Sequence, residues 1–217
     1  MNWLLLSLAV AMISLFCAVV DRSSNFVFDA KVLQDVARRG IATAQAAHKH
    51  NASSSQVIEA VIAEAKAQYP AYVTTTNGWI FNNAGGAMGS MTILHASFSE
   101  YLIIFGTAVG TEGHTGRFFA EDFFTIVFGE QWAYPAATQT KEIYRPGDQH
   151  HLPRLVAKQY RMPDECWALE YARGNIASML FFGLADTLTS TLDLVTLWQT
   201  VEGSASNMLR NALQGKI

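Results

Sequence analysis

The stretch at residues 166–174, CWALEYARG, constrains the fold most, because it reads as a buried β-strand that carries one carboxylate. Side chains on a strand alternate between two faces, so Trp167 and Tyr171 share one face and Glu170 lies on the other, between two alanines. An isolated carboxylate in an apolar hollow is costly, so we expect the pKa of Glu170 to be raised. The alternative is a structural glutamate that pairs with Arg173 or with a buried hydrogen-bond donor.

The composition indicates an apolar chain that forms one domain. Its 217 residues are enough for a sizeable core. Half of the residues are hydrophobic, 15% are charged and the mean hydropathy is +0.14, whereas an average soluble domain has roughly 25% charged residues. A net charge of −3 and a pI near 6.0 offer no basic surface for phosphates, which argues against a nucleic-acid partner. Cys17 and Cys166 lie in an apolar terminus and a core strand, so no disulfide framework is expected.

The N-terminal residues form an uncharged apolar run. As a helix, Asn2 to Val20 would extend roughly 29 Å, close to the thickness of a bilayer core. No basic segment precedes this run and no convincing cleavage site precedes Asp21, so a signal anchor is favoured over a cleaved signal peptide. We therefore predict a transmembrane anchor at residues 1–22 and a single domain at residues 23–217.

Helical and strand patterns divide that domain into three parts. Apolar residues at helical spacing predict a helix over residues 29–48, and the capping-box pattern of Ser53 and Gln56 begins a second helix. Short apolar runs from residue 78 onward predict an antiparallel barrel or sandwich. The predicted strands are 78–81, 91–97, 100–107, 125–128, 131–134, 142–144, 152–160 and 166–174. Two apolar helices follow, with more apolar surface than a small barrel needs, so we expect them to face a membrane or a second subunit.

The six histidines form no recognisable metal-binding pattern. His150 and His151 are adjacent and would face opposite sides of a strand, and His48 and His50 lie at a helix end away from acidic ligands. The glycine-rich loop at residues 110–117 does not match a phosphate-binding loop, and the chain has no Gly-x-Ser-x-Gly elbow. We therefore predict neither a metal nor a cofactor.

Seven sequence blocks carry a resemblance to a known family. They are NAGGAMG (83–89), LHASFSEY (94–101), FGTA (105–108), GHTGR (113–117), PGDQHHLPR (146–154), WALEYARG (167–174) and LADT (184–187). In this order they resemble the family of C-8 sterol isomerases and sigma receptors, over nearly the whole chain. The blocks at 146–154 and 184–187 are similar to the fungal-type isomerases rather than to the animal receptor.

This resemblance implies a fold, a location and two alternative functions. The implied fold is α+β: a cupin-like antiparallel β-barrel with an N-terminal transmembrane helix, two helices before the barrel and two membrane-facing C-terminal helices, often as a homotrimer. The isomerases are cofactor-independent endoplasmic reticulum membrane proteins of ergosterol-type biosynthesis that move the sterol ring double bond from C8 to C7. The receptors bind hydrophobic amines without known sterol turnover. We expect an isomerase with a sterol substrate and lipophilic amines as inhibitors, and the alternative is the non-catalytic receptor.

Isomerisation requires an acid that protonates C9 and a base that removes a proton from C7, through a carbocation at C8. Glu170 is the predicted acid, because a desolvated carboxyl group stays protonated near neutral pH and because it matches the family's pocket glutamate. Where the receptor has the partner aspartate, this chain has Phe124, so Glu121 and Asp122 are both catalytic candidates. On a strand, Asp122 would share the face of Phe124 and Glu121 would point away. The candidate substrate-binding residues are Tyr101, Phe105, Met91, Ile103, Trp167 and Leu180.

Overall fold

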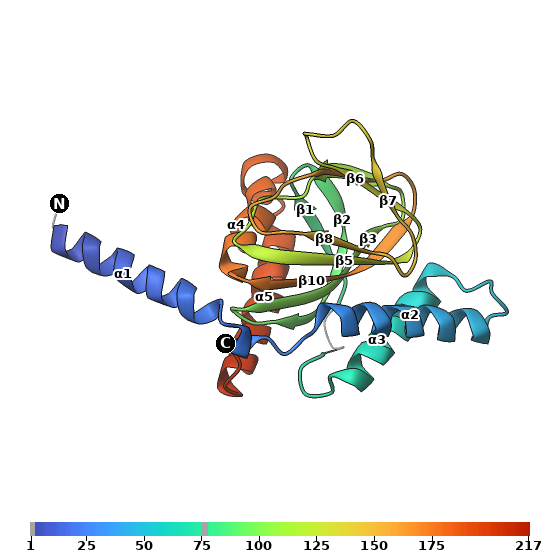
Figure 1. The fold of residues 1–217 in the computed structure, drawn as a ribbon, viewed down its shortest axis with the longest axis horizontal. Coiled ribbons are helices and arrows are strands. Elements are labelled where there is room, and N and C mark those ends of the chain that lie inside the picture. The colour runs from blue at the N-terminus through green and yellow to red at the C-terminus, as the bar shows by residue number, and fades with distance from the viewer. Residues whose placement is uncertain (1–2, 75–77) are drawn as a thin grey trace.

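The computed structural model of the protein describes residues 3–74 and 78–217 and has the predicted α+β class, with antiparallel strands (Figure 1). The helices are α1 (Trp3–Val20), α2 (Ala30–Ala47), α3 (Ser54–Gln68), α4 (Ile176–Asp186) and α5 (Leu194–Leu213), with a π-helical turn at Thr187–Thr191 between the last two. The strands are β1 (Ile80–Ala84), β2 (Ala87–Ala96), β3 (Glu100–Thr107), β4 (Thr111–His114), β5 (Ala120–Phe128), β6 (Gln131–Tyr134), β7 (Glu142–Tyr144), β8 (Gln149–Leu152), β9 (Gln159–Met162) and β10 (Cys166–Gly174).

The strands form a six-stranded and a four-stranded sheet. The order in the first is β1-β2-β3-β10-β5-β8, and the order in the second is β4-β9-β6-β7. The predicted core strand, β10, pairs with β3 on one edge and with β5 on the other, so its backbone polar groups are satisfied in the interior. In the described residues the ladders do not close into one barrel. A backbone hydrogen bond of 2.9 Å from the His114 amide to the Gly85 carbonyl joins the sheets where β4 passes the β1–β2 turn.

Two apolar clusters lie on the two faces of the six-stranded sheet. On the outer face, Leu169 and Tyr171 pack with buried residues of α2 and α3. On the inner face, Ala168 and Ala172 pack with the β2, β3 and β5 side chains that face α4 and α5. The predicted capping box of α3 is confirmed, because the Ser53 hydroxyl accepts from the Gln56 amide and the Gln56 side chain accepts from the Ser53 amide. Helices α2 and α3 thus cover the outer face of the six-stranded sheet, whereas α4, α5 and the four-stranded sheet lie over its inner face.

The predictions for two segments between residues 110 and 160 are wrong, for identifiable reasons. The predicted strand 152–160 is two separate strands, β8 and β9, because Pro153 lacks an N–H donor and Leu155 has a left-handed backbone (φ 60°). The glycine-rich run at residues 110–117, predicted as a loop, contains β4. A Cβ on Gly113 would lie only 2.5 Å from the Gly85 carbonyl oxygen. The glycine is therefore needed because two backbone segments pass close to each other at this point.

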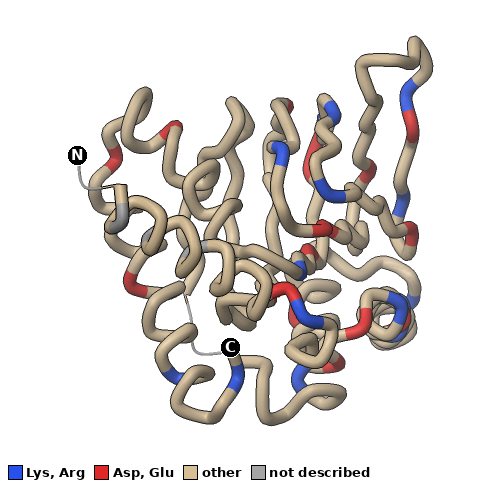
Figure 2. Tube along the Cα trace, turned by 60° about the vertical axis from the view of Figure 1, so that its left-hand side comes forward, with Lys and Arg blue, Asp and Glu red and all other residues tan. Residues whose placement is uncertain are grey.

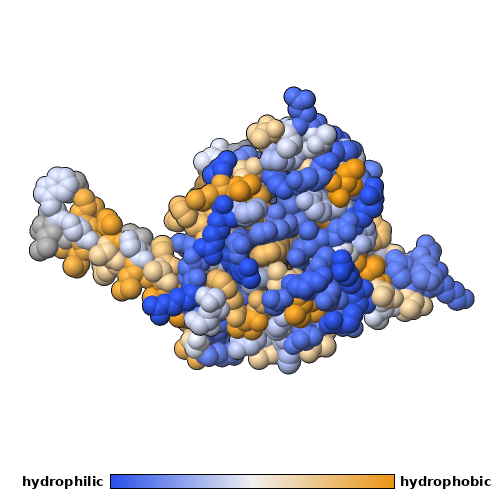
Figure 3. All heavy atoms as spheres, in the orientation of Figure 1, coloured by the Kyte–Doolittle hydropathy of each residue, from blue (hydrophilic) through white to orange (hydrophobic). Residues whose placement is uncertain are grey.

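The surface of α1, α4 and α5 is apolar. Helix α1 extends from the body of the molecule (Figure 1) and has no charged residue along its length (Figure 2). Orange, hydrophobic side chains run along it in Figure 3. On the last two helices, large side chains such as Phe181, Val195 and Trp198 are exposed. No single described helix meets the length and hydropathy needed to cross a membrane, but the segments Leu5–Val20 and Ser23–Ala47, bent by 61°, meet them together.

A buried ion pair joins segments that are far apart in sequence. The Glu100 side chain is fully buried and accepts hydrogen bonds from the amides of Val27 (2.7 Å) and Phe28 (3.0 Å) and from the Tyr171 hydroxyl (2.6 Å). The Lys216 ammonium lies 2.9 Å from the same carboxylate. Burial lowers the pKa of Lys216, and the charge of Glu100 opposes that shift. One carboxylate thus holds together the linker before α2, strands β3 and β10, and the residues that follow α5.

We expect Lys216→Met to lower the free energy of unfolding by roughly 3–5 kcal/mol, because it leaves Glu100 as a buried charge without its counter-ion. The matched control is Lys49→Met, at an exposed position. Chemical unfolding of the detergent-solubilised protein measures both variants. Equal stability of the two would contradict a structural role for the pair.

Candidate active site

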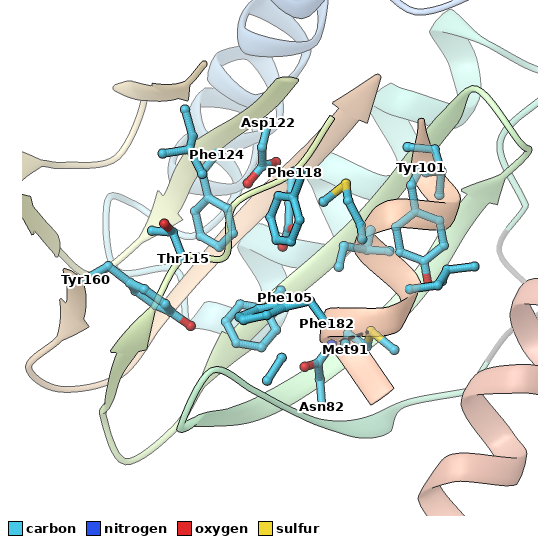
Figure 4. A pocket seen from close by; sticks show the side chains of 18 of the residues that line it. Asn82, Met91, Tyr101, Phe105, Thr115, Phe118, Asp122, Phe124, Tyr160 and Phe182 are labelled. Carbon is cyan, nitrogen blue, oxygen red and sulfur yellow. Dashed lines mark hydrogen bonds between the residues drawn. The ribbon is translucent and has the colours of Figure 1, made fainter. Parts of the chain in front are cut away.

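A cavity lies inside the fold, between the inner face of the six-stranded sheet, the four-stranded sheet and α4 (Figure 4). Its lining is mostly apolar and aromatic. The lining residues include Asn82, Met91, Tyr101, Ile103, Phe105, Thr115, Phe118, Asp122, Phe124, Gln131, His150, Tyr160, Glu170, Met179, Leu180, Phe182 and Thr200. In the close-up, Tyr101 and Tyr160 lie at opposite ends and Asp122 and Phe124 lie between them. The cavity is therefore an elongated apolar space with acidic groups near its middle.

Glu170 points into this cavity, as the alternation along β10 predicted. Its neighbours across the ladders are Ile103 of β3 and Phe124 of β5, and the small side chains of Ala168 and Ala172 flank it on its own strand. The alternative pairing with Arg173 does not form. Glu170 is thus a carboxyl group among apolar side chains that leave it space.

Asp122 lies on the same face and lines the same cavity. It pairs with Ala172 across the ladder, which places it diagonal to Glu170, so their Cβ atoms are roughly 7 Å apart. The Oδ1 atom of Asp122 is buried and has no hydrogen-bond partner among the described residues. The neighbouring Glu121 points the other way, and its carboxylate accepts from the Arg173 guanidinium at 2.8 Å and lies 3.4 Å from the His151 ring. The structure therefore brings Asp122, and not Glu121, to Glu170.

Burial changes the protonation of both cavity carboxyl groups. Desolvation raises the pKa of Glu170 well above its usual value, and the negative charge of Asp122 raises it further. Desolvation raises the pKa of Asp122 to about 7, against a hydrogen bond from the Phe123 amide that lowers it. Desolvation and the repulsion between the two charges therefore favour a pair that holds at least one proton near neutral pH.

The structure brings most of the predicted substrate-binding residues together. Those that line the cavity are Met91, Tyr101, Ile103, Phe105 and Leu180. Burial raises the pKa of Tyr101 to about 12, and its hydroxyl lies 3.3 Å from the Ser204 hydroxyl of α5. Trp167 lies on the opposite face of β10, where its ring packs edge-on against Trp79 with ring centroids 5.3 Å apart. It does not contact the cavity.

Several polar residues at the cavity wall were not predicted, among them Gln131, His150 and Tyr160. On sequence alone His150 is weighed only as a metal ligand, and it lies in the part of β8 that precedes the predicted strand 152–160. Its burial beside exposed His151 fits the expectation that the two face opposite sides. Three or more His, Cys, Asp or Glu side chains do not converge on a metal-ligand arrangement anywhere in the part of the chain that the structure describes. The residues present thus do not fit a cupin-type metal centre.

The fold and the site define an α+β protein with a pair of buried carboxyl groups in an apolar cavity. The sequence profile described as "ERG2 and Sigma1 receptor like protein" matches residues 4–216. The chain belongs to this family, as the resemblance indicated.

Relatives from both branches of the family match the chain. It is 48% identical over 211 residues to the C-8 sterol isomerase of Pyricularia oryzae, covering 96% of this chain and 93% of the relative. Identity to the C-8 sterol isomerase ERG2 of Gibberella zeae is 46% over 216 residues, with 99% and 89% covered. The sigma non-opioid intracellular receptor 1 of Gallus gallus is 40% identical over 156 residues, with 70% and 69% covered. A cupin from Shewanella frigidimarina, 13% identical, matches 48% of this chain and 94% of its own at a TM-score of 0.38, which is too low to support an argument.

The raised pKa values predict how stability depends on pH. A carboxyl group whose pKa is raised by folding stabilises the folded state only while it is protonated, so this contribution is lost as the pH rises from about 4 through 7. We therefore expect the double variant Asp122→Asn/Glu170→Gln to match the unmodified protein near pH 4.5. At pH 8 it should be more stable by roughly 1–3 kcal/mol. Chemical unfolding at both pH values measures this difference, and an equal difference at both would contradict the assigned shifts.

Proposed function

We propose that the protein is a sterol isomerase that moves the ring double bond from C8 to C7. The observation that supports this most is the pair Asp122 and Glu170, held without an ion-pair partner among the described residues in an apolar cavity. Relatives that are 46–50% identical over most of the chain are named C-8 sterol isomerases. A sterol is apolar apart from its hydroxyl group, which agrees with the apolar and aromatic lining.

The proposed reaction uses one carboxyl group as acid and the other as base. Glu170, protonated near neutral pH, gives its proton to C9, and the electrons of the C8–C9 double bond form the new C9–H bond. The positive charge then lies at C8. Ionised Asp122 removes a proton from C7, and the electrons of that C–H bond form the C7–C8 double bond. The proton on Asp122 returns to Glu170, so the cycle consumes no oxidant, reductant or cofactor.

The surroundings of the pair suit a short-lived carbocation. The ionised carboxylate of Asp122 stabilises positive charge in a medium of low dielectric constant. Two aromatic rings, Phe105 and Phe124, line the cavity edge to face with centroids 6.1 Å apart, and Tyr101 lies at one end. Aromatic faces attract cations. We propose that these groups stabilise the C8 cation and keep water away from it.

The second candidate is a non-catalytic receptor for hydrophobic amines, because receptors of that branch are also relatives. A lipophilic ammonium would place its charge where the C8 cation forms, so the same carboxylate can hold either one. The isomerase relatives match the chain with higher identity and greater coverage. The isomerase is therefore the preferred function.

We propose that α1, with residues 1–22, anchors the chain in the endoplasmic reticulum membrane, and that the exposed side chains of α4 and α5 lie against that membrane. The end of α1 contacts the body near the start of α4: Phe16 packs edge-on against Phe98, with ring centroids 5.8 Å apart, and the side-chain amide of Asn175, which precedes α4, donates to the Cys17 sulfur at 3.1 Å. The residues from 23 to 217 form the single catalytic domain. We expect the family's homotrimer, which the mass of the detergent-solubilised protein tests.

The isomerase proposal predicts the effect of three substitutions. Glu170→Gln and Asp122→Asn should each lower sterol isomerisation by roughly 10²–10⁴-fold, because neither amide transfers protons as a carboxyl group does. Glu121→Gln is the matched control and should keep most of the activity, because Glu121 faces away from the cavity. The assay is conversion of Δ8 to Δ7 sterols, measured by mass spectrometry, in cells that lack their own isomerase. No conversion by the unmodified protein would favour the receptor, and full activity of Glu170→Gln would contradict the assigned acid.

The anchor proposal predicts how the chain partitions. We expect the full chain to stay in the membrane pellet after extraction with alkaline carbonate, since α1 would remain in the bilayer. A chain that begins at residue 23 should stay bound in neutral buffer through α4 and α5 but be released by carbonate. Immunoblotting of the pellet and the supernatant measures both. Release of the intact full chain would contradict the anchor.

A further inference from the structure

Two buried polar groups in the cavity wall have no role in the proton transfers described above. Gln131 and His150 are 2% and 3% exposed, and both line the cavity. The Oε1 atom of Gln131 and the Nε2 atom of His150 have no hydrogen-bond partner among the described residues. Buried polar atoms are nearly always hydrogen-bonded, so two orphans in one cavity indicate a polar group on the ligand.

The strand register places these groups at a defined distance from the acid pair. His150 of β8 lies opposite Phe124 of β5, and Phe124 lies opposite Glu170 of β10. Two strand spacings therefore separate His150 from Glu170, or about 10 Å between their backbones. Gln131 of β6 pairs with Tyr144, whose ring centroid lies 4.8 Å from that of His150. Both residues thus lie toward the four-stranded sheet.

The opposite end of the cavity is formed by α4, α5 and β3. In Figure 4 Tyr101 lies at this end and Tyr160, of the four-stranded sheet, lies at the other. The Tyr101 hydroxyl is 3.3 Å from that of Ser204 in α5, and Tyr160 pairs with Ala133 of β6, the strand that carries Gln131. The side chains that α4 contributes, such as Met179 and Leu180, are apolar. The cavity therefore has a polar end at the second sheet and an apolar end at the exposed helices.

The two orphan atoms match the needs of a hydroxyl group. The Gln131 oxygen can only accept a hydrogen bond. Burial lowers the pKa of His150 to about 4, with Lys158 and His151 acting in the same direction and Glu142 against it, so the ring is neutral and Nε2 can donate one hydrogen bond. The nearest acid, Glu142, is already bound by Lys158 at 2.6 Å and by the Tyr144 hydroxyl at 2.8 Å, and it lies 4.0 Å from Nε2. A hydroxyl donates once and accepts, which satisfies both atoms.

We propose that Gln131 and His150 bind the hydroxyl group on ring A of the sterol substrate. The hydroxyl donates to Gln131 Oε1 and accepts from His150 Nε2. Ring A then lies over Phe124, ring B lies at Asp122 and Glu170, and the alkyl side chain extends toward α4 and α5. This assignment rests on the proposed isomerase function and adds the orientation of the substrate to it.

The test compares two substrates in four forms of the purified protein. The substrates are a Δ8 sterol and its analogue without the ring A hydroxyl. The forms are the unmodified protein, Gln131→Met, His150→Leu and the control His151→Leu, which changes the adjacent, outward-facing residue. We expect the unmodified protein to prefer the hydroxylated substrate by at least 10-fold in kcat/KM, since a site built to bind a hydroxyl rejects the analogue that lacks it.

Gln131→Met and His150→Leu should each lower kcat/KM for the hydroxylated sterol by roughly 10–100-fold and leave the analogue within about threefold of the unmodified protein. His151→Leu should keep the preference. Turnover of the analogue shows that each variant is folded, and Gln131→Met decides the matter if His150→Leu does not fold. Equal losses for both substrates, or no loss, would overturn the assignment. If no form isomerises either sterol, the isomerase proposal fails separately, and the binding affinities of the two sterols to the same four forms decide the hydroxyl site.

Discussion

The structure depends on the pairing of β10 with a strand on each side. Because β3 and β5 occupy both of its edges, the side chains of β10 can point only toward α2 and α3 or toward the cavity. Leu169 and Tyr171 take the first direction and complete the outer core. Glu170 takes the second direction, where the desolvation that raises its pKa is also what suits it to acid chemistry near neutral pH. The strand pairing that completes the outer core therefore also buries the carboxyl group that the proposed reaction uses as its acid.

Local pattern was enough to predict the parts of the site that lie on one strand. Alternation along 166–174 gives the direction of Glu170, and alternation along β5 separates Asp122 from Glu121 once that segment is known to be a strand. The same rule already placed Trp167 on the face of Tyr171, so its choice as a substrate-binding residue contradicted the pattern, and the structure has it beside Trp79. Alternation along 166–174 was therefore enough to place Trp167 on the face away from Glu170.

Other features depend on contacts between distant segments, which no local pattern records. His150 becomes a cavity residue only because β8 pairs with β5, and Gln131 only because the second sheet faces the first. The glycine-rich run at β4 has the composition of a loop, and it becomes a strand because it pairs with β9 (Gln159–Met162), a distant part of the chain. The division into two sheets likewise depends on where each strand stops: β8 ends just before Pro153, and the next strand, β9, belongs to the other sheet.

The buried carboxylate of Glu100 also has a consequence for the order in which the chain emerges during synthesis. Its other partners, the amides of Val27 and Phe28 and the Tyr171 hydroxyl, leave the ribosome well before Lys216 does. Until the ammonium arrives, the nascent sheet would have to enclose a carboxylate without its counter-ion, which is strongly unfavourable. Docking of the linker that follows α1 onto β3 is therefore completed late, after translation of nearly the entire domain.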